Sequence, residues 1–111
     1  MIDFKSEVLK IKDQMIEDIK KLCAIPSMQD DSTVSEFAPF GKANREALDA
    51  MLEIGKRDGF EVEDVDGYAG HIDIGEGDET FGILGHLDVV PVNEAGWNSD
   101  PFNVIIKDDK L

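Results

Sequence analysis

Cysteine, basic residues and long apolar runs are all scarce in this sequence of 111 residues. The single Cys23 cannot form an intramolecular disulfide, and such a chain suits a reducing compartment. Because Cys23 lies in an amphipathic pattern, we expect a buried thiol rather than a nucleophile. Only 11 basic residues stand against 25 acidic ones, and the resulting net charge of −14 argues against binding to nucleic acids or anionic membranes.

No apolar run approaches the roughly 18 residues of a membrane-spanning helix, and no basic segment followed by an apolar one marks a signal peptide. We therefore expect a cytoplasmic protein. Internal repeats and low-complexity linkers are absent, and no Ser-His-Asp or Cys-His arrangement is apparent. Gly75-Glu76-Gly77 lacks the third glycine and the following helix of a nucleotide-binding loop. The hydrophobic content of 41% nevertheless suffices for a core.

The apolar residues recur with helical spacing in two segments and then with strand-like patterns. The spacing predicts helices over Asp3–Cys23, with Asp3 or Ser6 as the cap, and over about Pro39–Arg57. Strands are predicted over Phe60–Asp66, Tyr68–Glu76, Thr80–Asp88 and Phe102–Lys107, with Asp66-Gly67 as a hairpin turn and Asp108-Asp109 as the start of another turn. This order indicates an α/β fold with a mixed sheet.

The most informative stretch is Thr80–Pro91, an apolar run led in by Gly82 and ended by Pro91. Such a run is typical of a strand that is buried on both faces. Residues two apart on a strand share a face, so His86 and Asp88 should lie on one side and Leu87 on the other. A carboxylate beside an imidazole can fix its tautomer and leave the second nitrogen free to bind a metal.

Several segments together resemble a known family. Gly85-His86-Leu87-Asp88-Val89-Val90-Pro91, followed by Gly96-Trp97 and Asp100-Pro101-Phe102, resembles the first metal-site motif of the M20 family of zinc peptidases. Further matches, in the same order as in the PepV-like bacterial dipeptidases of that family, are Phe40-Gly41, Arg57-Asp58-Gly59-Phe60 and Asp66-Gly67-Tyr68-Ala69-Gly70-His71. Because family members are several hundred residues long, residues 1–111 are expected to be the N-terminal portion of the catalytic domain, without the lid or dimerisation domain.

The resemblance implies an α/β/α sandwich of the zinc-exopeptidase type and the hydrolysis of dipeptides with two zinc ions. It implies that His86 is a metal ligand and that Asp88 orients His86 and counts as catalytic. The bridging aspartate, the glutamate general base and the other ligands are expected beyond Leu111. The Ile25-Pro26-Ser27 turn is expected to be scaffold near the site.

Alternative readings stay open. A related amidohydrolase acting on N-acyl amino acids, or a non-catalytic interaction module of the same fold, fits the same motifs. His71 lies in a predicted strand without a ligand motif and is expected to be structural, whereas Trp97 could rim the active site or anchor its own loop. We expect Asp30-Asp31 to be a solvated turn rather than a calcium site. Uncovered apolar strand residues should make the 111-residue chain self-associate.

Overall fold

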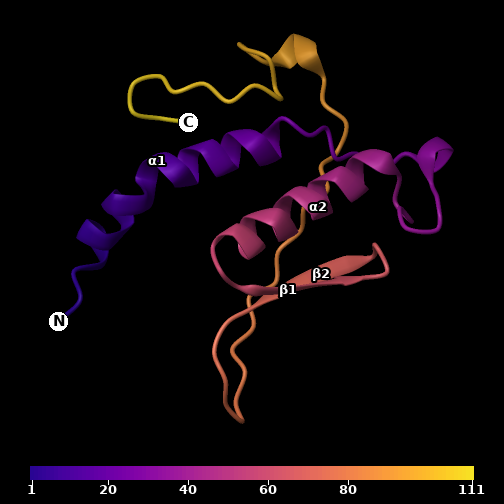
Figure 1. Cartoon of the computed structure of the whole chain (residues 1–111). Coiled ribbons are helices and arrows are strands. Elements are labelled where there is room, and N and C mark those ends of the chain that lie inside the picture. The colour runs from indigo at the N-terminus through magenta and orange to yellow at the C-terminus, as the bar shows by residue number, and fades with distance from the viewer. The chain divides into compact units, whose positions relative to one another are not determined.

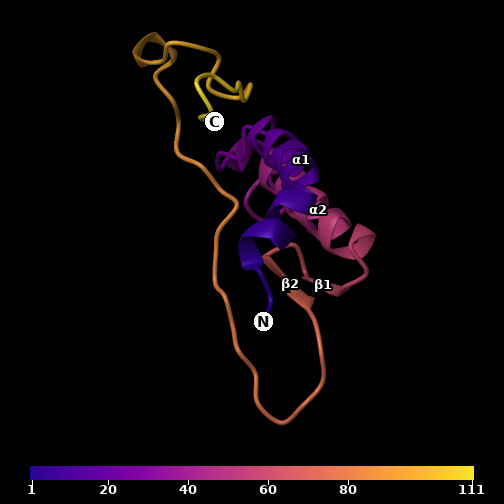
Figure 2. The ribbon, with the colours of Figure 1, turned by 90° about the vertical axis from the view of Figure 1, so that its left-hand side faces the viewer.

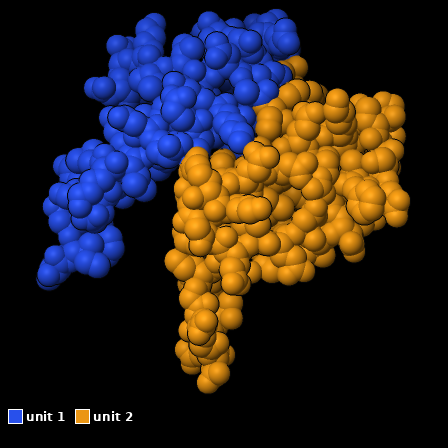
Figure 3. All heavy atoms as spheres, in the orientation of Figure 1, with its two compact units in different colours: residues 1–24, 93–111 blue, residues 25–92 orange.

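The computed structural model describes residues 1–111, which form two helices and one β-hairpin (Figure 1). The chain divides into two compact units, coloured separately in Figure 3. One unit combines Met1–Ala24, which contains α1 (Phe4–Cys23), with Asn93–Leu111. The other, Ile25–Val92, contains α2 (Lys42–Arg57), β1 (Glu61–Val65) and β2 (Ala69–Asp73). Short 3₁₀ helices lie at Asp31–Thr33 and Glu94–Gly96. Neither α-helix has the length and apolar character that crossing a bilayer requires.

Helix α1 confirms the first predicted helix and its cap. The Asp3 carboxylate accepts hydrogen bonds from the Ser6 amide at 3.3 Å and from the Ser6 hydroxyl at 2.6 Å. No residue of α1 is buried, and its apolar residues Val8 and Leu9 are exposed. The prediction that Cys23 is buried is wrong, because this residue at the end of the helix is exposed. Helical periodicity thus identifies the helix but not what covers its apolar side.

Helix α2 begins at Lys42 rather than near Pro39, because a tight turn precedes it. Gly41 has φ 97°, and a Cβ atom there would lie 2.6 Å from the Asp30 carbonyl oxygen. The hydroxyl of Thr33 accepts the Lys42 amide hydrogen at 2.9 Å and so satisfies one of the free N–H groups at the helix start. The loop after Ser27 is therefore joined to the beginning of α2.

Strands β1 and β2 confirm the predicted hairpin. They pair in antiparallel register, with Val62 opposite Ile72, and the turn uses Asp66 and Gly67 at φ 52° and 74°. Val65 pairs with Ala69, so the loop has three residues, and the Tyr68 amide donates to the Val65 carbonyl at 3.0 Å across the two residues with positive φ, a conformation that Asp and Gly adopt readily. Helix α2 packs against both strands and buries Ala47, Leu48 and Ala50, which form most of the small core.

The other two predicted strands are wrong. Thr80–Asp88 and Phe102–Lys107 belong to neither helix nor strand, so the sheet is a two-stranded antiparallel hairpin rather than a mixed sheet. The fold is a mixture of helix and strand, compatible with an α/β fold, and the α/β/α sandwich that the resemblance implies stays a prediction. In Figure 2 the segment after β2 runs as an extended, unpaired stretch (orange). An apolar run indicates strand propensity, but a strand also needs a neighbour for its N–H and C=O groups.

Candidate functional site

His86 and Asp88 lie beside each other on the extended segment, as their spacing predicts. The His86 Nδ1 atom is 3.0 Å from the backbone oxygen of Asp88 and 3.2 Å from its carboxylate Oδ1. Both partners accept hydrogen bonds, so they favour the tautomer with a proton on Nδ1 and a free lone pair on Nε2. The two side chains are 81% and 67% exposed, which leaves Nε2 accessible.

Ser27 connects this pair to the folded part of its unit. Ser27 is only 2% exposed and is the only buried polar or charged residue of the chain. Its hydroxyl donates to the Leu87 carbonyl at 2.6 Å, and its own carbonyl accepts the Val89 amide hydrogen at 3.1 Å. Sequence reasoning placed the turn with Ser27 near the site only through the family resemblance and did not identify these contacts.

The donor chemistry of the pair fits one position of a zinc site. A neutral imidazole with a free Nε2 and a carboxylate on Nδ1 is the usual arrangement of a zinc-binding histidine. A complete site needs at least three protein ligands, and no group of three His, Cys, Asp or Glu side chains in this chain is placed to hold a metal ion. His86 therefore fits as a single ligand, and the chain alone does not form the site.

His71 lies on β2 and is tied to two carboxylates. Its Nδ1 is 2.5 Å from Asp73 Oδ2, and its Nε2 is 3.3 Å from Glu63 Oε2 across the hairpin. The hydrogen bond to Asp73 and the negative charges of Asp73 and Glu63 raise the pKa of His71. Both ring nitrogens face carboxylates of the hairpin, and the structural role of His71 stays a prediction.

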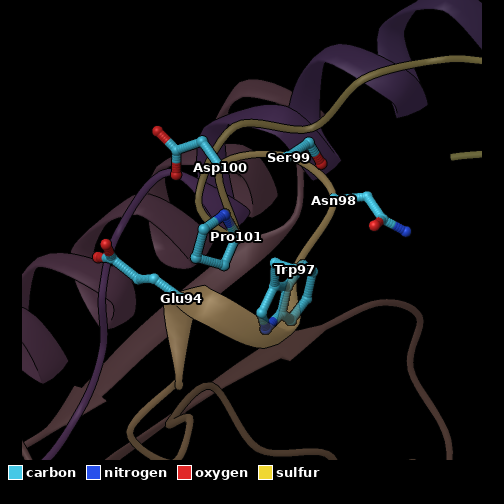
Figure 4. A pocket seen from close by; sticks show the side chains of 6 residues that line it. All are labelled: Glu94, Trp97, Asn98, Ser99, Asp100 and Pro101. Carbon is cyan, nitrogen blue, oxygen red and sulfur yellow. The ribbon is translucent and has the colours of Figure 1, made fainter.

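Trp97 lies in the other unit, beside a hollow of the C-terminal loop. The hollow is lined by Glu94, Trp97, Asn98, Ser99, Asp100 and Pro101, as Figure 4 shows. The Trp97 side chain is exposed, and its amide donates to the Glu94 carbonyl at 3.1 Å. The indole is 53% exposed and lines the hollow of its own loop, so both roles, loop anchor and rim of the active site, stay predictions.

The acidic pairs act as turn residues. The Asp30 carboxylate accepts the amide and the hydroxyl hydrogen of Ser32 at 3.0 and 2.6 Å, and these bonds lower the pKa of Asp30. Asp108 and Asp109 have φ 52° and 59° in a turn closed by hydrogen bonds between Lys107 and Lys110. The predicted turns at both places are confirmed.

Comparison with known proteins gives one consistent group of relatives. The chain is 48% identical to a protein of Staphylococcus epidermidis, 47% identical to one of Staphylococcus haemolyticus and 46% identical to one of Staphylococcus saprophyticus, all named "Putative dipeptidase". Each match covers 97% of this chain but only 23% of the relative, so the chain spans about a quarter of their length. No protein-family profile matches the chain.

Proposed function

We propose that this chain is the N-terminal part of the catalytic domain of a zinc-dependent dipeptidase of the M20 type. The observation that carries the proposal is the His86–Asp88 pair, in which Nδ1 is engaged and Nε2 is accessible. The pair occurs in a chain about 47% identical to relatives named as dipeptidases, and the motif around it resembles the first metal-site motif of M20 peptidases. Those names favour a small peptide over an N-acyl amino acid as the substrate.

In the proposed enzyme, His86 binds one of two zinc ions through Nε2. Asp88 accepts the Nδ1 proton, which fixes the imidazole tautomer and makes the ring a better donor. Zinc, when bound, polarises the peptide carbonyl and lowers the pKa of water, so that hydrolysis proceeds near neutral pH. His86 and Asp88 supply no general base, because one is occupied as a ligand and the other as its hydrogen-bond partner. In this proposal, the base and the remaining ligands come from outside residues 1–111.

The test uses the polypeptide encoded by the complete reading frame that contains this chain. We expect it to hydrolyse dipeptides, to lose activity when zinc is chelated, and to regain activity when zinc is restored. His86→Ala should abolish hydrolysis, whereas His71→Gln, the matched control at the only other histidine, should leave it nearly unchanged. Hydrolysis that survives both chelation and His86→Ala would contradict the proposal. Zinc binding without hydrolysis of either substrate class would favour a non-catalytic module.

We further propose that the 111-residue chain self-associates and that the protein is cytoplasmic. On the extended segment, Phe81 and Ile83 are each 90% exposed and Leu84 is 100% exposed. Clustered apolar side chains of this size favour association, although the net charge of −14 opposes it at low salt. Sedimentation in moderate salt should show a concentration-dependent dimer that Leu84→Asp weakens. A strictly monomeric chain would refute self-association.

A further inference from the structure

Residues 74–92, which carry His86 and Asp88, have few attachments to the rest of their unit. No residue between Ile74 and Val92 belongs to a helix or a strand, so no ladder of backbone hydrogen bonds orders them. The hydrogen bonds that join this stretch to the rest of the chain are the two to Ser27. Leu87 is half-buried at the same place, whereas the residues on either side of it are exposed. Any fixed orientation of the pair must therefore originate near Ser27.

The two hydrogen bonds of Ser27 hold the two peptide groups that flank Asp88. The hydroxyl bond reaches the carbonyl of Leu87, between His86 and Asp88, and the carbonyl bond reaches the amide of Val89, directly after Asp88. Fixing these two peptide groups restricts the backbone dihedral angles of Asp88. The backbone oxygen and the carboxylate of Asp88 are the groups that face His86 Nδ1. Restricting Asp88 thus also restricts the imidazole.

Ser27 is itself held by the folded part of the unit. Its amide donates to the Ile25 carbonyl at 2.8 Å, and the nearby Asp30 amide donates to the Phe40 carbonyl at 3.2 Å, next to the start of α2. Burial excludes water that would compete for the Leu87 carbonyl, and removal of the hydroxyl would leave that carbonyl without its partner. The serine therefore joins the segment to a stretch of chain that is itself bonded to the residues just before α2.

We infer that Ser27 is a positioning residue, which holds the Asp88 backbone so that Asp88 keeps the His86 imidazole in one tautomer and orientation. Ser27 forms its hydrogen bonds with the peptide groups of Leu87 and Val89 and not with the His86 imidazole, so it acts through those peptide groups. The importance of Ser27 for catalysis rests on the proposed function, because His86 needs a fixed orientation of Nε2 only if it binds a metal.

The first measurement needs no variant. Amide hydrogen exchange in the 111-residue chain should show Val89 protected about tenfold relative to Val90, because one net hydrogen bond corresponds to roughly that factor. Amides of Ile83 and Leu84, which have no partner, should exchange as in an unfolded chain. An unprotected Val89 amide would overturn the inference.

The second measurement compares Ser27→Ala with Ser32→Ala. Ser32 is the matched control, because its hydroxyl also donates a 2.6 Å hydrogen bond but is exposed and bonds to Asp30. Ser27→Ala should remove most of the Val89 protection and, by NMR at a fixed pH where imidazole is neutral, lower the Nδ1–H fraction of His86. His71, on β2, should keep its signals in both variants and serves as an internal reference.

Three outcomes contradict the inference. His86 could keep its tautomer in Ser27→Ala, it could change equally in Ser32→Ala, or His71 and His86 could change together, which would indicate a general loss of fold. Ser27→Cys, which keeps the size and a weak donor, should retain part of the effect and separates loss of the bond from loss of volume. Zinc-dependent hydrolysis by the polypeptide of the complete reading frame tests the proposed function separately. If that polypeptide hydrolyses no dipeptide while the Ser27 effects persist, the proposed function fails and the positioning role of Ser27 stands.

Discussion

Arg45 joins α2 to the hairpin, and its replacement should loosen the core of that unit. The guanidinium Nη1 lies 2.5 Å from Asp64 Oδ2 on β1, and Arg45 also pairs with Asp49 one turn further along the helix. A third bond of 3.3 Å reaches the Phe37 carbonyl. The hydrogen bonds to Asp49 and Asp64 raise the pKa of Arg45. The pKa of Asp64 is lowered, mainly by the hydrogen bond from the Gly67 amide and next by the hydrogen bond from Arg45.

The free energy of unfolding that is lost on replacing Arg45 can be estimated from the partial burial of its ion pairs. The side chains of Arg45 and Asp64 are 23% and 31% exposed. The free energy of their interaction should therefore lie between that of a hydrogen bond to a charged group, about 1.5–3 kcal/mol, and that of an exposed ion pair, about 0.2–1 kcal/mol. We expect a coupling of about 1 kcal/mol between them, and the Asp49 pair should add roughly 0.3–0.5 kcal/mol. Arg45→Met keeps the apolar stem, so it should cost about 1.5 kcal/mol through lost polar contacts.

Amide hydrogen exchange of β1 and β2 reports this free energy, and 1.4 kcal/mol corresponds to about tenfold faster exchange. A double-mutant cycle with Asp64→Asn isolates the pair, because asparagine can still accept the Gly67 amide hydrogen that now bonds Asp64 at 2.8 Å. Lys42→Met is the matched control, since Lys42 pairs with Glu46 at 3.8 Å on the exposed side of the same helix. A coupling below about 0.3 kcal/mol, or an equal effect of the control, would refute the reasoning.

Three further results are expected. Gly55→Ala should destabilise the unit by about 1 kcal/mol although alanine has the better helix propensity, because a Cβ would lie 2.8 Å from Ile72 Cδ1. Urea unfolding measures this loss, and Ile72→Val, which removes Cδ1, should reduce it. Because the pKa of His71 is raised when folded, its stabilisation is complete below about pH 6.5 and disappears as the pH rises through the folded pKa; an NMR midpoint no higher than in urea would contradict this. The 111-residue chain should bind zinc weakly and hydrolyse no dipeptide; hydrolysis abolished by His86→Ala would show otherwise.

The elements predicted correctly are those that neighbouring residues determine. Asp3 caps α1 through Ser6, three residues away, and the Asp66-Gly67 turn needs only two residues with positive φ. Both signals are local, so they remain valid whatever packs around them. The start of α2 was missed by about one turn, because the loop contacts of Gly41 and not helical propensity decide where that helix begins.

The predictions that failed concern partners. The apolar residues of Thr80–Asp88 indicate strand propensity, but no neighbouring strand lies beside them, so their backbone groups form no ladder. The prediction that Cys23 is buried fails for the same reason, since its position on the apolar face of an amphipathic helix does not tell whether anything packs against that face. The local sequence pattern specifies the backbone conformation, whereas burial depends on which other parts of the protein pack against the residue.

In the candidate site, too, the local contact was predictable and the long-range contact was not. The spacing of His86 and Asp88 is sufficient to predict that their side chains meet, because only Leu87 lies between them. Ser27 lies 60 residues from Leu87, and a serine in a turn carries no local signal for so distant a partner. Its burial in a chain with almost no other buried polar group is the feature that identifies it, and burial is visible only in the structure.

The unpaired strand and the incomplete ligand set fall on the same segment of the chain. Thr80–Asp88 has no neighbouring strand, and His86, near its C-terminal end, lacks the further ligands of a zinc site. Parallel strands that lie side by side end at the same edge of a sheet. A strand that paired with this segment in parallel would therefore satisfy the backbone and also bring its own terminal residues beside His86. If the proposed function holds, we expect strand formation over Thr80–Asp88 and tight zinc binding to appear together, with Ser27 holding the segment in place before either occurs.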